Sequence, residues 1–477
     1  MTEEQLAINT IKQASTGELE QFSLRVSGRE PLICEEIFRH LPGRRLTFKA
    51  KYNDSYLLVK LFFSKKDYLR ENRGLDLLLK NDIPSPKKAW SLIDGEAQLV
   101  TTEFFHDSES LASRCKDDKC EDSICQTLTL LGRMHQAGLV QEDIHLDNFL
   151  FSEGEVKVLD GASIKLYKNI KSSAIIDNLA LFFAQFSPQL DAAIPSLMPS
   201  YEGIDVDLEK LRKRIIQKRL WRVKKYQHKS LRSCTEFLAS KNQRRFTVMR
   251  RDHDCKELRD LLEQPDLNIA QGAVLKNGHT STVVQVKASG DTSWVVKRYN
   301  IKNWRHGLGR SLRPSRAWIS WKNGQALSLL GVPTPKPVAL QENRKGRLRK
   351  EAYLVTEYIS GDSLEHWLLK RPGHEAPPWL ERSILNIFGA FLSSQISHGD
   401  MKSSNFIVHE ETLMVIDLDG MHVHRDEKAF RHSFRKDIRR FLANWQGNTL
   451  RQFSKLLEPV AKQVCLDIQI PGGRSEH

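Results

Sequence analysis

The chain has no apolar run long enough to cross a membrane, and its seven cysteines are an odd number. A membrane-spanning helix needs about 20 apolar residues, so none is expected. The N-terminal MTEEQLAINTIKQ lacks the basic and apolar regions of a secretory signal. Without secretion, an odd number of cysteines argues for free, reduced thiols. These absences predict a cytoplasmic protein without disulfides.

Zinc-ligand spacing is also missing. Cys115, Cys120 and Cys125 recur every five residues, whereas zinc sites use gaps of two to four residues and a fourth ligand. A charged, partly helical loop is the favoured interpretation of this segment. What the chain does have is ordinary globular composition, with 477 residues, 40% hydrophobic and 28% charged. Its length predicts two or three domains.

The charge is strongly one-sided, with a formal net charge of +14. Basic residues concentrate in 210–251 and 297–316. Such stretches can be solvated faces of helices. They can also bind an anionic membrane surface, an acidic glycolipid or nucleic acid. Apolar residues recur at helical spacing through 210–225, which predicts an amphipathic helix that packs on its own domain or lies on anionic lipid. No nucleic-acid recognition motif accompanies the basic stretches, so no specific nucleic acid is expected.

One spacing of acidic and amide residues occurs twice. The first set is Asp143, Asn148 and Asp160, and the second is Asp400, Asn405 and Asp417. Within each set the residues stand five and then twelve positions apart. A base, a metal-binding amide and a metal-binding carboxylate in this order form the catalytic half of a kinase-type phosphotransferase. A single Asp or Asn is more often a turn or cap residue, but the joint arrangement in two copies favours two kinase-like units.

The residue roles follow from the needs of phosphoryl transfer, which are positioning and charge neutralisation. We expect Asp143 and Asp400 to accept the proton of the attacking hydroxyl. The expected magnesium ligands are Asn148, Asp160, Asn405 and Asp417, because hard oxygen ligands suit that ion. Lys60 and Lys297 lie in predicted strands and would hold the α- and β-phosphates of ATP. Lys402 would reach the transferring phosphate.

The order of segments is also repeated. Each half has a strand lysine, a helix, a Pro-x-Pro segment, a second strand, an acidic linker and then the two loops. This is the order of a small sheet-rich lobe followed by a larger helical lobe. The sequence therefore predicts an α+β protein of two tandem protein-kinase-like bilobal domains, residues 1–252 and 253–477.

The two halves differ in their expected sites. Glu71 is placed to pair with Lys60, but the corresponding residue of the second half is Ser320, and no acid occurs from 292 to 341. Lys297 therefore lacks that partner unless another acid substitutes. Conversely, the first catalytic loop reads QED with His145 where the second has HGD with Lys402. The first half keeps the ion pair, and the second keeps the better catalytic loop.

The phosphate-loop signal is weak in both halves. The second half has KNGHTST at 276–282, with Gly278 as its one glycine, and the first half has PGRR at 42–45. Neither is a full glycine-rich loop, and a hairpin turn explains each about as well.

The sequence resembles the lipopolysaccharide core kinase family of the Kdo/WaaP type. The resemblance rests on VVKRY (295–299), SRAWISW (315–321), LGVPTPKPVAL (330–340), HGDMKSSNF (398–406) and VIDLDG (415–420). It covers most of both halves and is stronger in the second. It implies a protein-kinase-like fold and ATP- and magnesium-dependent phosphorylation of a heptose or Kdo hydroxyl on the lipopolysaccharide inner-core glycolipid. It also implies work at the cytoplasmic face of the inner membrane.

Other functions stay open. One or both halves could be pseudokinases that scaffold core assembly, as the QED loop and Ser320 suggest. A kinase for another small molecule or a protein is a further alternative. We also expect Arg305, Arg310, Arg313 and Arg316 to contact acidic core sugars or anionic lipid, because they lie where a kinase places its regulatory helix, close to the phosphate-binding cleft.

Overall fold

The computed structural model describes residues 4–5, 8–14, 19–95, 97–116, 120–278, 280–288, 292–299, 314–346, 348–371 and 375–468. Its contacts divide the chain into two compact units. The first unit is Met1–Gln185 with Ala192–Ile215, and the second is Phe186–Asp191 with Ile216–His477. The fold is a mixture of helix and sheet, which confirms the predicted α+β class.

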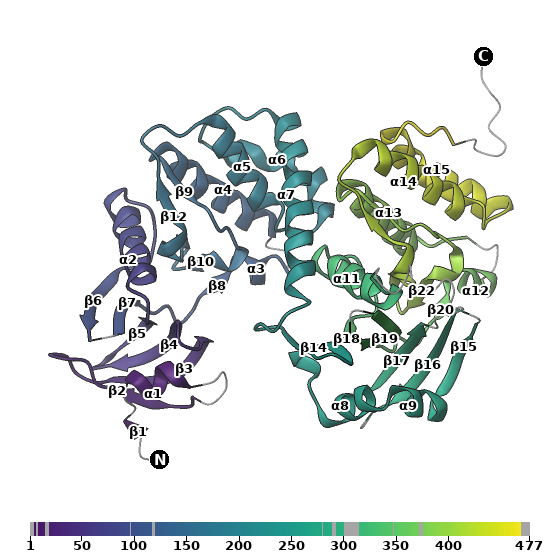
Figure 1. Ribbon diagram of the computed structural model, residues 1–477. Helices are drawn as coiled ribbons and strands as arrows, with labels where there is room; N and C mark the ends of the chain where they lie inside the picture. Colours follow the sequence, from purple (N-terminus) through teal and green to yellow (C-terminus); the bar gives the residue numbers. More distant parts are fainter. Residues whose placement is uncertain are drawn as a thin grey trace. The chain divides into compact units, whose positions relative to one another are not determined.

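The first unit begins with a sheet whose described strands run in the order β1-β2-β3-β4-β5-β7-β6. All described pairings in this sheet are antiparallel except the parallel pair β1–β2. Helix α2 (Lys65–Lys80) packs beside the sheet (Figure 1). The strands are β1 (Glu4–Gln5), β2 (Phe22–Leu24), β3 (Leu32–Leu41), β4 (Arg45–Tyr52), β5 (Ser55–Phe62), β6 (Lys88–Asp94) and β7 (Ala97–Glu103).

The second unit has a sheet of related order, β13-β14-β18-β19-β17-β16-β15, and all its described pairings are antiparallel. Read from its other edge, the second sheet runs β15-β16-β17-β19-β18, which corresponds to β3-β4-β5-β7-β6 of the first sheet. The additional strands lie at opposite edges: β14 and β13 follow β18, whereas β2 and β1 lie beyond β3. Helix α11 (Arg316–Leu329) occupies the place of α2 in the chain order. The strands are β13 (Phe237–Lys241), β14 (Arg245–Arg250), β15 (Ala273–Asn277), β16 (Ser281–Lys287), β17 (Ser293–Tyr299), β18 (Pro337–Lys345) and β19 (Leu348–Glu357).

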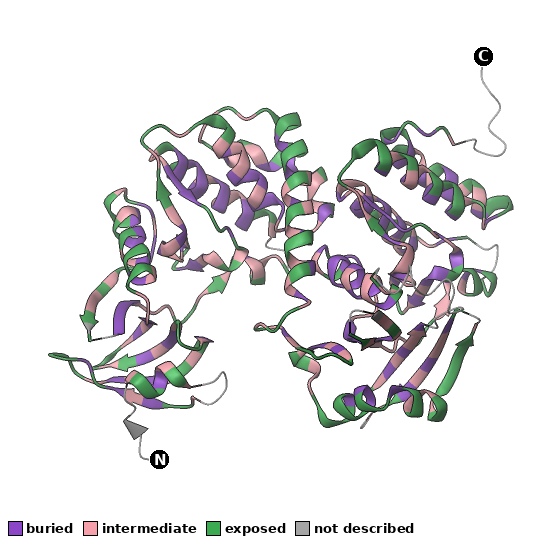
Figure 2. Cartoon of the chain, in the orientation of Figure 1, coloured by how far each residue is buried: buried purple, intermediate pink, exposed green. Residues whose placement is uncertain are grey.

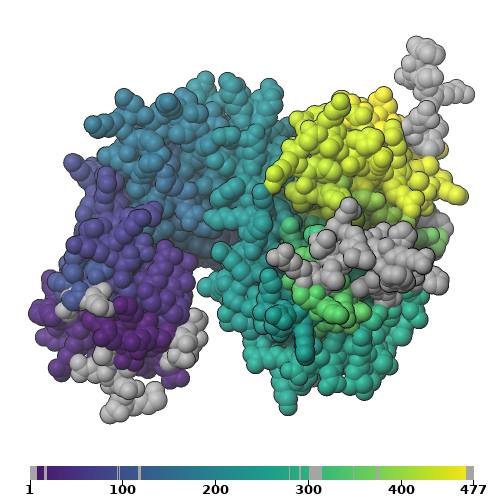
Figure 3. All heavy atoms as spheres, in the orientation of Figure 1, coloured from purple at the N-terminus to yellow at the C-terminus, as the bar shows by residue number. Residues whose placement is uncertain are grey.

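A helical lobe follows each large sheet, and in the second unit the lobe and the sheet lie at opposite ends (Figures 1 and 3). The first unit's helices are α1 (Ile8–Gln13), α3 (Leu111–Arg114), α4 (Cys120–Gln136), α5 (Ser172–Phe183) and α6 (Ile194–Leu197), and α7 (Leu208–Lys229) continues into the second unit. Those of the second unit are α8 (Lys256–Glu263), α9 (Pro265–Gln271), α12 (Leu364–Leu369), α13 (Pro378–Ser393), α14 (Glu427–Leu442) and α15 (Gly447–Gln463).

Small sheets in these lobes carry the candidate loops. In the first unit β11-β10-β8 and β12-β9 pair, and in the second β23-β22-β20 and β24-β21 pair. The strands are β8 (Glu109–Ser110), β9 (Leu139–Gln141), β10 (Phe149–Ser152), β11 (Glu155–Val158), β12 (Ile164–Leu166), β20 (Asp362–Ser363), β21 (Ile396–Ser397), β22 (Phe406–His409), β23 (Thr412–Val415) and β24 (His422–Val423).

Apolar residues at helix and strand periods build the cores (Figure 2). In the second unit, apolar residues from α13, α14 and α15 surround the strands that carry the catalytic loop, with Phe388, Phe434, Phe441 and Phe453 all buried. Ser315 caps α11 and Asp426 caps α14, each accepting a backbone N–H of the first turn. The site of the second unit therefore stands on a packed helical base.

The basic helix α7 packs through its apolar face, with Leu211, Ile215 and Val223 buried. Arg219 is fully buried as well, where it makes two contacts to Asp191, of 2.6 and 2.9 Å, and one of 3.0 Å to the carbonyl of Ser393. Within the described residues no helix is long and apolar enough to cross a membrane.

The division between the units differs from the predicted boundary at 252/253. Contacts divide the chain inside α7, and β13 and β14 pair into the second sheet through β18. The basic composition of 210–251 suggested a segment that ends the first domain. The apolar side chains of β13 and β14 decide otherwise, because Phe237, Phe246 and Val248 are buried against Trp321 and Leu340.

Candidate active site

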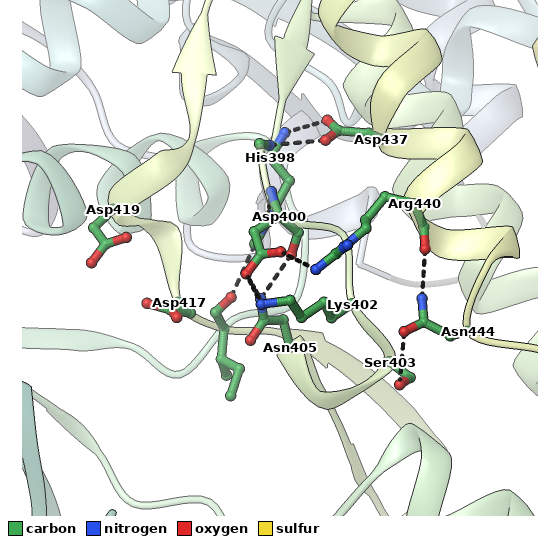
Figure 4. Close-up of polar contacts among 12 residues, drawn as sticks. His398, Asp400, Lys402, Ser403, Asn405, Asp417, Asp419, Asp437, Arg440 and Asn444 are labelled. Atoms are coloured by element: carbon green, nitrogen blue, oxygen red, sulfur yellow. Dashed lines mark hydrogen bonds and ion pairs between the residues drawn. The ribbon is translucent and has the colours of Figure 1, made fainter. Parts of the chain in front are cut away.

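The catalytic loop of the second unit brings Asp400, Lys402 and Asn405 together (Figure 4). Lys402 Nζ lies 2.7 Å from Asp400 Oδ2, and Arg440 of α14 approaches the other carboxylate oxygen at 3.5 Å. The Asn405 amide donates to the main-chain carbonyl of Asp400 at 2.7 Å. Asp400 is about two-fifths exposed, at 39%. It is therefore a cation-flanked carboxylate that solvent and a substrate hydroxyl can reach.

Helix α14 fixes the backbone of this loop through Asp437 (Figure 4). Its buried carboxylate accepts the main-chain N–H groups of His398 and Gly399 at 2.6 and 2.9 Å. Burial raises the pKa of Asp437, and the two backbone donors and His398 act in the opposite direction. Our sequence reasoning missed this residue, although its position among Phe434, Ile438 and Phe441 on an amphipathic helix marks it as a buried acid.

The loop geometry requires a glycine at Gly399. Its φ is +83°, and a Cβ there would stand 2.7 Å from the carbonyl oxygen of Gly420. The neighbouring His398 side chain contacts the carbonyl of Ile416 at 3.0 Å through Nε2. These contacts join the catalytic loop directly to the loop that carries Asp417.

Asp417 lies in the left-handed conformation, with φ of 62°, just before the 3₁₀ turn Leu418–Gly420. Its Oδ1 is 2.5 Å from Lys297 Nζ on β17. Burial tends to raise the pKa of Asp417, but the charge and hydrogen bond of Lys297, with Arg316 and His398, outweigh it and lower the pKa. Asp417 is thus held as a carboxylate, the form that a metal ion requires.

The missing helix glutamate is replaced by acids of this loop. Ser320 bonds the Tyr299 hydroxyl at 3.0 Å. Lys297 Nζ instead faces Asp417 and, at 3.8 Å, Asp419. Arg316 at the start of α11 contacts Asp419 at 2.5 Å. The sequence analysis left Lys297 without a partner unless another acid took the place of the helix glutamate. Asp417 and Asp419 take that place, and they lie 120 and 122 positions from Lys297, too far for a local motif to reveal them.

A cavity of about 450 Å³ opens between the large sheet and the helical lobe of the second unit. Its apolar lining includes Val283, Val295, Leu354, Ile407 and Ile416, and its polar residues include Lys297, Asn405, Asp417 and Glu357. An apolar pocket with a cation, an amide and a carboxylate converging at its edge matches the needs of a base and a polyphosphate. Oxygen donors from Asn405 and Asp417 fit a magnesium ion.

Gly278 has no such place in the cavity. It bonds across a hairpin, its N–H donating to the carbonyl of Ser281 at 3.1 Å, and it is not among the residues that line the cavity. The hairpin interpretation of KNGHTST is the one that this geometry favours. Among the described residues, no three His, Cys, Asp or Glu side chains gather as a metal cluster.

Comparison with known families identifies the segment that holds this site. Residues 267–458 match the model of the Lipopolysaccharide kinase (Kdo/WaaP) family. The match lies within the second unit. The Kdo/WaaP match contains Lys297, Asp400, Lys402, Asn405 and Asp417, and it confirms the family resemblance and the assignment as a kinase. No curated protein matches the chain.

Outside the Kdo/WaaP segment, the first unit repeats many of these contacts. Asn148 donates to the carbonyl of Asp143 at 3.1 Å, and Gln141 donates to the carbonyl of Leu159 at 2.8 Å in the place of His398. Lys60 pairs with the buried Glu71 at 2.6 Å. The other Glu71 oxygen accepts the N–H of Ala162, which stands where the Kdo/WaaP segment has Asp419.

The first catalytic loop nevertheless differs chemically. Asp143 is 62% exposed, and His145 lies 3.8 Å from its carboxylate in place of a lysine. Glu142 is engaged by Lys165 at 3.1 Å. Asn178 of α5 donates to the carbonyl of Gln141, so an amide takes the place that Asp437 has beneath the second loop.

The two candidate metal aspartates also differ in charge. Burial raises the pKa of Asp160, and Glu71 and Asp143 act in the same direction, whereas Lys60 and Arg45 lower it. Lys60 is already neutralised by Glu71, so it stabilises the Asp160 carboxylate less than Lys297 stabilises Asp417. The structure thus brings both predicted sets together but favours the anionic metal ligand in the Kdo/WaaP segment.

Proposed function

We propose that the second unit is an ATP- and magnesium-dependent kinase that phosphorylates a heptose or Kdo hydroxyl of the lipopolysaccharide inner core. The observation that carries the proposal is the convergence of Lys297, Asn405 and Asp417 on one cleft within the segment that matches the family. Asp400 is bonded to Asn405 beside that cleft. The match supports sugar phosphorylation in lipopolysaccharide core, while the acceptor hydroxyl and the metal are our inference.

The residues divide the work of phosphoryl transfer. Asp400 orients the acceptor hydroxyl and takes its proton, and Lys402 beside it stabilises charge on the transferring group. Lys297 binds the phosphates of the nucleotide. Asn405 and Asp417 would hold magnesium, which supplies positive charge to the phosphate oxygens when bound. Arg440 adds a second cation beside Asp400.

We further propose that the first unit is a kinase-like domain without a catalytic role. The repeated strand order, the Lys60–Glu71 pair and the Gln141 and Asn148 contacts support the kinase-like fold. The neutralised Glu142 and the His145 substitution support the absence of activity. The first unit would then be a pseudokinase linked to a Kdo/WaaP-type kinase, and it could act as a scaffold in lipopolysaccharide core assembly.

The glycolipid acceptor implies work at the inner surface of the membrane, for which a net charge of +14 is favourable. Of the four arginines expected to contact it, Arg305, Arg310 and Arg313 lie outside the described residues. Arg316 lies against Asp419 and over the Tyr299 ring. That arginine is therefore engaged within the site, which favours a positioning role over lipid contact.

The test is ATP consumption on purified inner-core oligosaccharide by the full chain, with Asp400→Asn and Asp143→Asn as matched changes. We expect Asp400→Asn to lower kcat by at least 100-fold, about 2.7 kcal/mol in the barrier. Asp143→Asn should retain wild-type kcat. Full activity of Asp400→Asn would contradict the assigned chemistry, and loss in Asp143→Asn alone would move it to the first unit.

A further inference from the structure

The hairpin between β3 and β4 places arginines on the site face of the first sheet. Arg39 pairs with Thr47, Thr47 pairs with Lys60, and Arg45 lies two residues before Thr47 on the same strand. Cross-strand partners and residues two apart share a face of a sheet. Arg39, Arg45 and Lys60 therefore project together. This is the face on which Glu71 of α2 reaches Lys60.

These arginines are incompletely neutralised. Lys60 is paired with Glu71 and Arg44 with Asp67, at 2.6 and 3.2 Å. Arg45 lies 5.9 Å from the Phe62 ring, and its buried Nε has no hydrogen-bond partner among the described residues. Partial desolvation lowers the pKa of Arg39, as do the neighbouring charges of Arg45 and Arg44, whereas the carboxylates of Asp160 and Asp143 act in the opposite direction. The cations repel one another, and a bound anion would relieve that repulsion.

The second unit lacks this arrangement at the same sheet positions. Lys276 pairs with Val283 and Val283 pairs with Lys297, so Lys276 stands where the first unit has Arg39. The position of Arg45 is occupied by Ser281, which is buried. The first unit thus presents a guanidinium where the candidate kinase site presents a small hydroxyl.

Guanidinium groups bind phosphate oxygens through paired N–H donors, with a fixed positive charge. Two such groups beside a preorganised lysine supply the charge that a divalent cation supplies at a kinase site. We propose that the first unit binds a phosphate-bearing ligand through Arg39, Arg45 and Lys60 without a divalent metal ion. The ligand is a nucleotide or a phosphorylated sugar. This site is separate from the proposed catalysis and does not depend on it.

The experiment is titration calorimetry on the full chain carrying Asp417→Asn and Asn405→Ala, which removes the candidate metal ligands of the second unit. ATP, tripolyphosphate and glucose 6-phosphate are each added in EDTA. We expect one ligand per chain, and Arg39→Ala with Arg45→Ser should weaken binding at least tenfold. Arg25→Ser removes one exposed positive charge just after β2, is the control for the loss of surface charge, and should have no effect.

The three ligands distinguish the source of the phosphate. Binding of ATP at least tenfold tighter than of tripolyphosphate identifies a nucleotide, and tighter binding of glucose 6-phosphate identifies a sugar phosphate. Equal binding of all three supports recognition of phosphate alone. No binding in EDTA, or binding that the double arginine change leaves intact, overturns the proposal. If Arg39→Ala with Arg45→Ser folds poorly, Arg39→Lys with Arg45→Lys replaces it. The lysine variant preserves the charge and should retain part of the affinity.

Discussion

At the scale of residues, the two strand lysines solve one electrostatic problem with different acids. A buried or half-buried ammonium needs a carboxylate partner, and a helix supplies Glu71 to Lys60. Lys297 has Ser320 in that position, and the loop residues Asp417 and Asp419 provide the carboxylates. The first unit has its acid on the helix, at Glu71, and an alanine, Ala162, in the metal loop. The second unit has a serine, Ser320, on the helix and its acid, Asp419, in the metal loop.

Asp419 is therefore expected to position Lys297. Asp419→Ala should raise the KM for ATP by about tenfold, about 1.4 kcal/mol, because Lys297 loses one carboxylate and α11 loses its Arg316 contact. Steady-state kinetics with varied ATP would measure it, with Asp467→Ala as a control at an exposed aspartate. Adding Ser320→Glu should recover part of the loss by recreating the first unit's arrangement. An unchanged KM would contradict this role.

The pKa of Asp417 gives a pH-dependent effect on stability. Because the folded-state pKa lies below the usual 3.8, the ion pair with Lys297 stabilises the folded state fully above about pH 5. That contribution is lost as the pH falls through the folded pKa. Asp417→Asn should lower the free energy of unfolding at pH 7 by about 1–3 kcal/mol, and the difference should shrink below pH 3.8. Denaturation in urea without divalent metal would measure it, and a difference independent of pH would refute the assignment.

At the scale of elements, helices hold the candidate loops by contacts of two kinds. In the second unit Asn323 of α11 donates to the carbonyls of Leu418 and Met421 at 2.9 and 2.8 Å. In the first unit Gly74 of α2 packs directly against the backbone of Gly161, where any Cβ would overlap its carbonyl. Both units join helix and metal loop by side-chain hydrogen bonds, which in the first unit run from Glu71 and Arg70 to Ala162, and the first unit adds close backbone packing.

Two glycine-to-alanine changes separate packing from helix propensity. Gly74→Ala should destabilise the protein by about 3 kcal/mol, because the new methyl group has no space against Gly161. Gly389→Ala in α13, with no neighbouring atom within 4 Å, should stabilise by up to about 1 kcal/mol. Thermal unfolding of both variants would measure this, and equal effects would show that the α2 contact is not tight.

The tether from α14 to the catalytic loop should act on catalysis. Asp437→Asn keeps the shape but loses the charge that accepts two backbone N–H groups, so His398 and Gly399 would hold Asp400 less firmly. We expect kcat to fall at least tenfold with little change in the KM for ATP. Asp426→Asn at the cap of the same helix is the control. A fall confined to KM would show that the tether acts on the nucleotide instead.

At the scale of the whole molecule, the chain passes between the units more than once. Phe186–Asp191 belongs to the second unit although residues on both sides belong to the first. The buried Arg219–Asp191 pair holds this segment to α7 within the second unit. The units are therefore interleaved in sequence, and a cut at one position does not separate them cleanly.

A fragment of residues 253–477 should accordingly fold poorly. It lacks Phe237, Phe246 and Val248, whose loss would expose Trp321 and remove a hydrophobic cluster of the sheet. A fragment of residues 186–477 retains them, together with Asp191 as the partner of Arg219, and is the comparison. We expect cooperative thermal unfolding only of the longer fragment. Equal cooperative unfolding of both would show that β13 and β14 contribute little.

The sequence by itself determined the loops, because their chemistry lies in short, contiguous spacings. Asp400, Lys402 and Asn405 are close in the chain, and apolar strands on either side fix how they meet. The α+β class and the family followed from the same segments. The first unit's kinase-like fold and its lack of activity stay proposals, as do the individual residue roles.

Only the tertiary structure decided the partners that come from elsewhere in the chain. Asp437 beneath Gly399, Asp419 beside Lys297 and β14 beside β18 are contacts between segments far apart in sequence. The composition placed 210–251 in the first half because its positive charge is its most prominent feature. The few apolar residues of β13 and β14, which pack into the second sheet, form too short a pattern to be recognised in the sequence. Burial and hydrogen bonding select such contacts in three dimensions, and a linear spacing records neither.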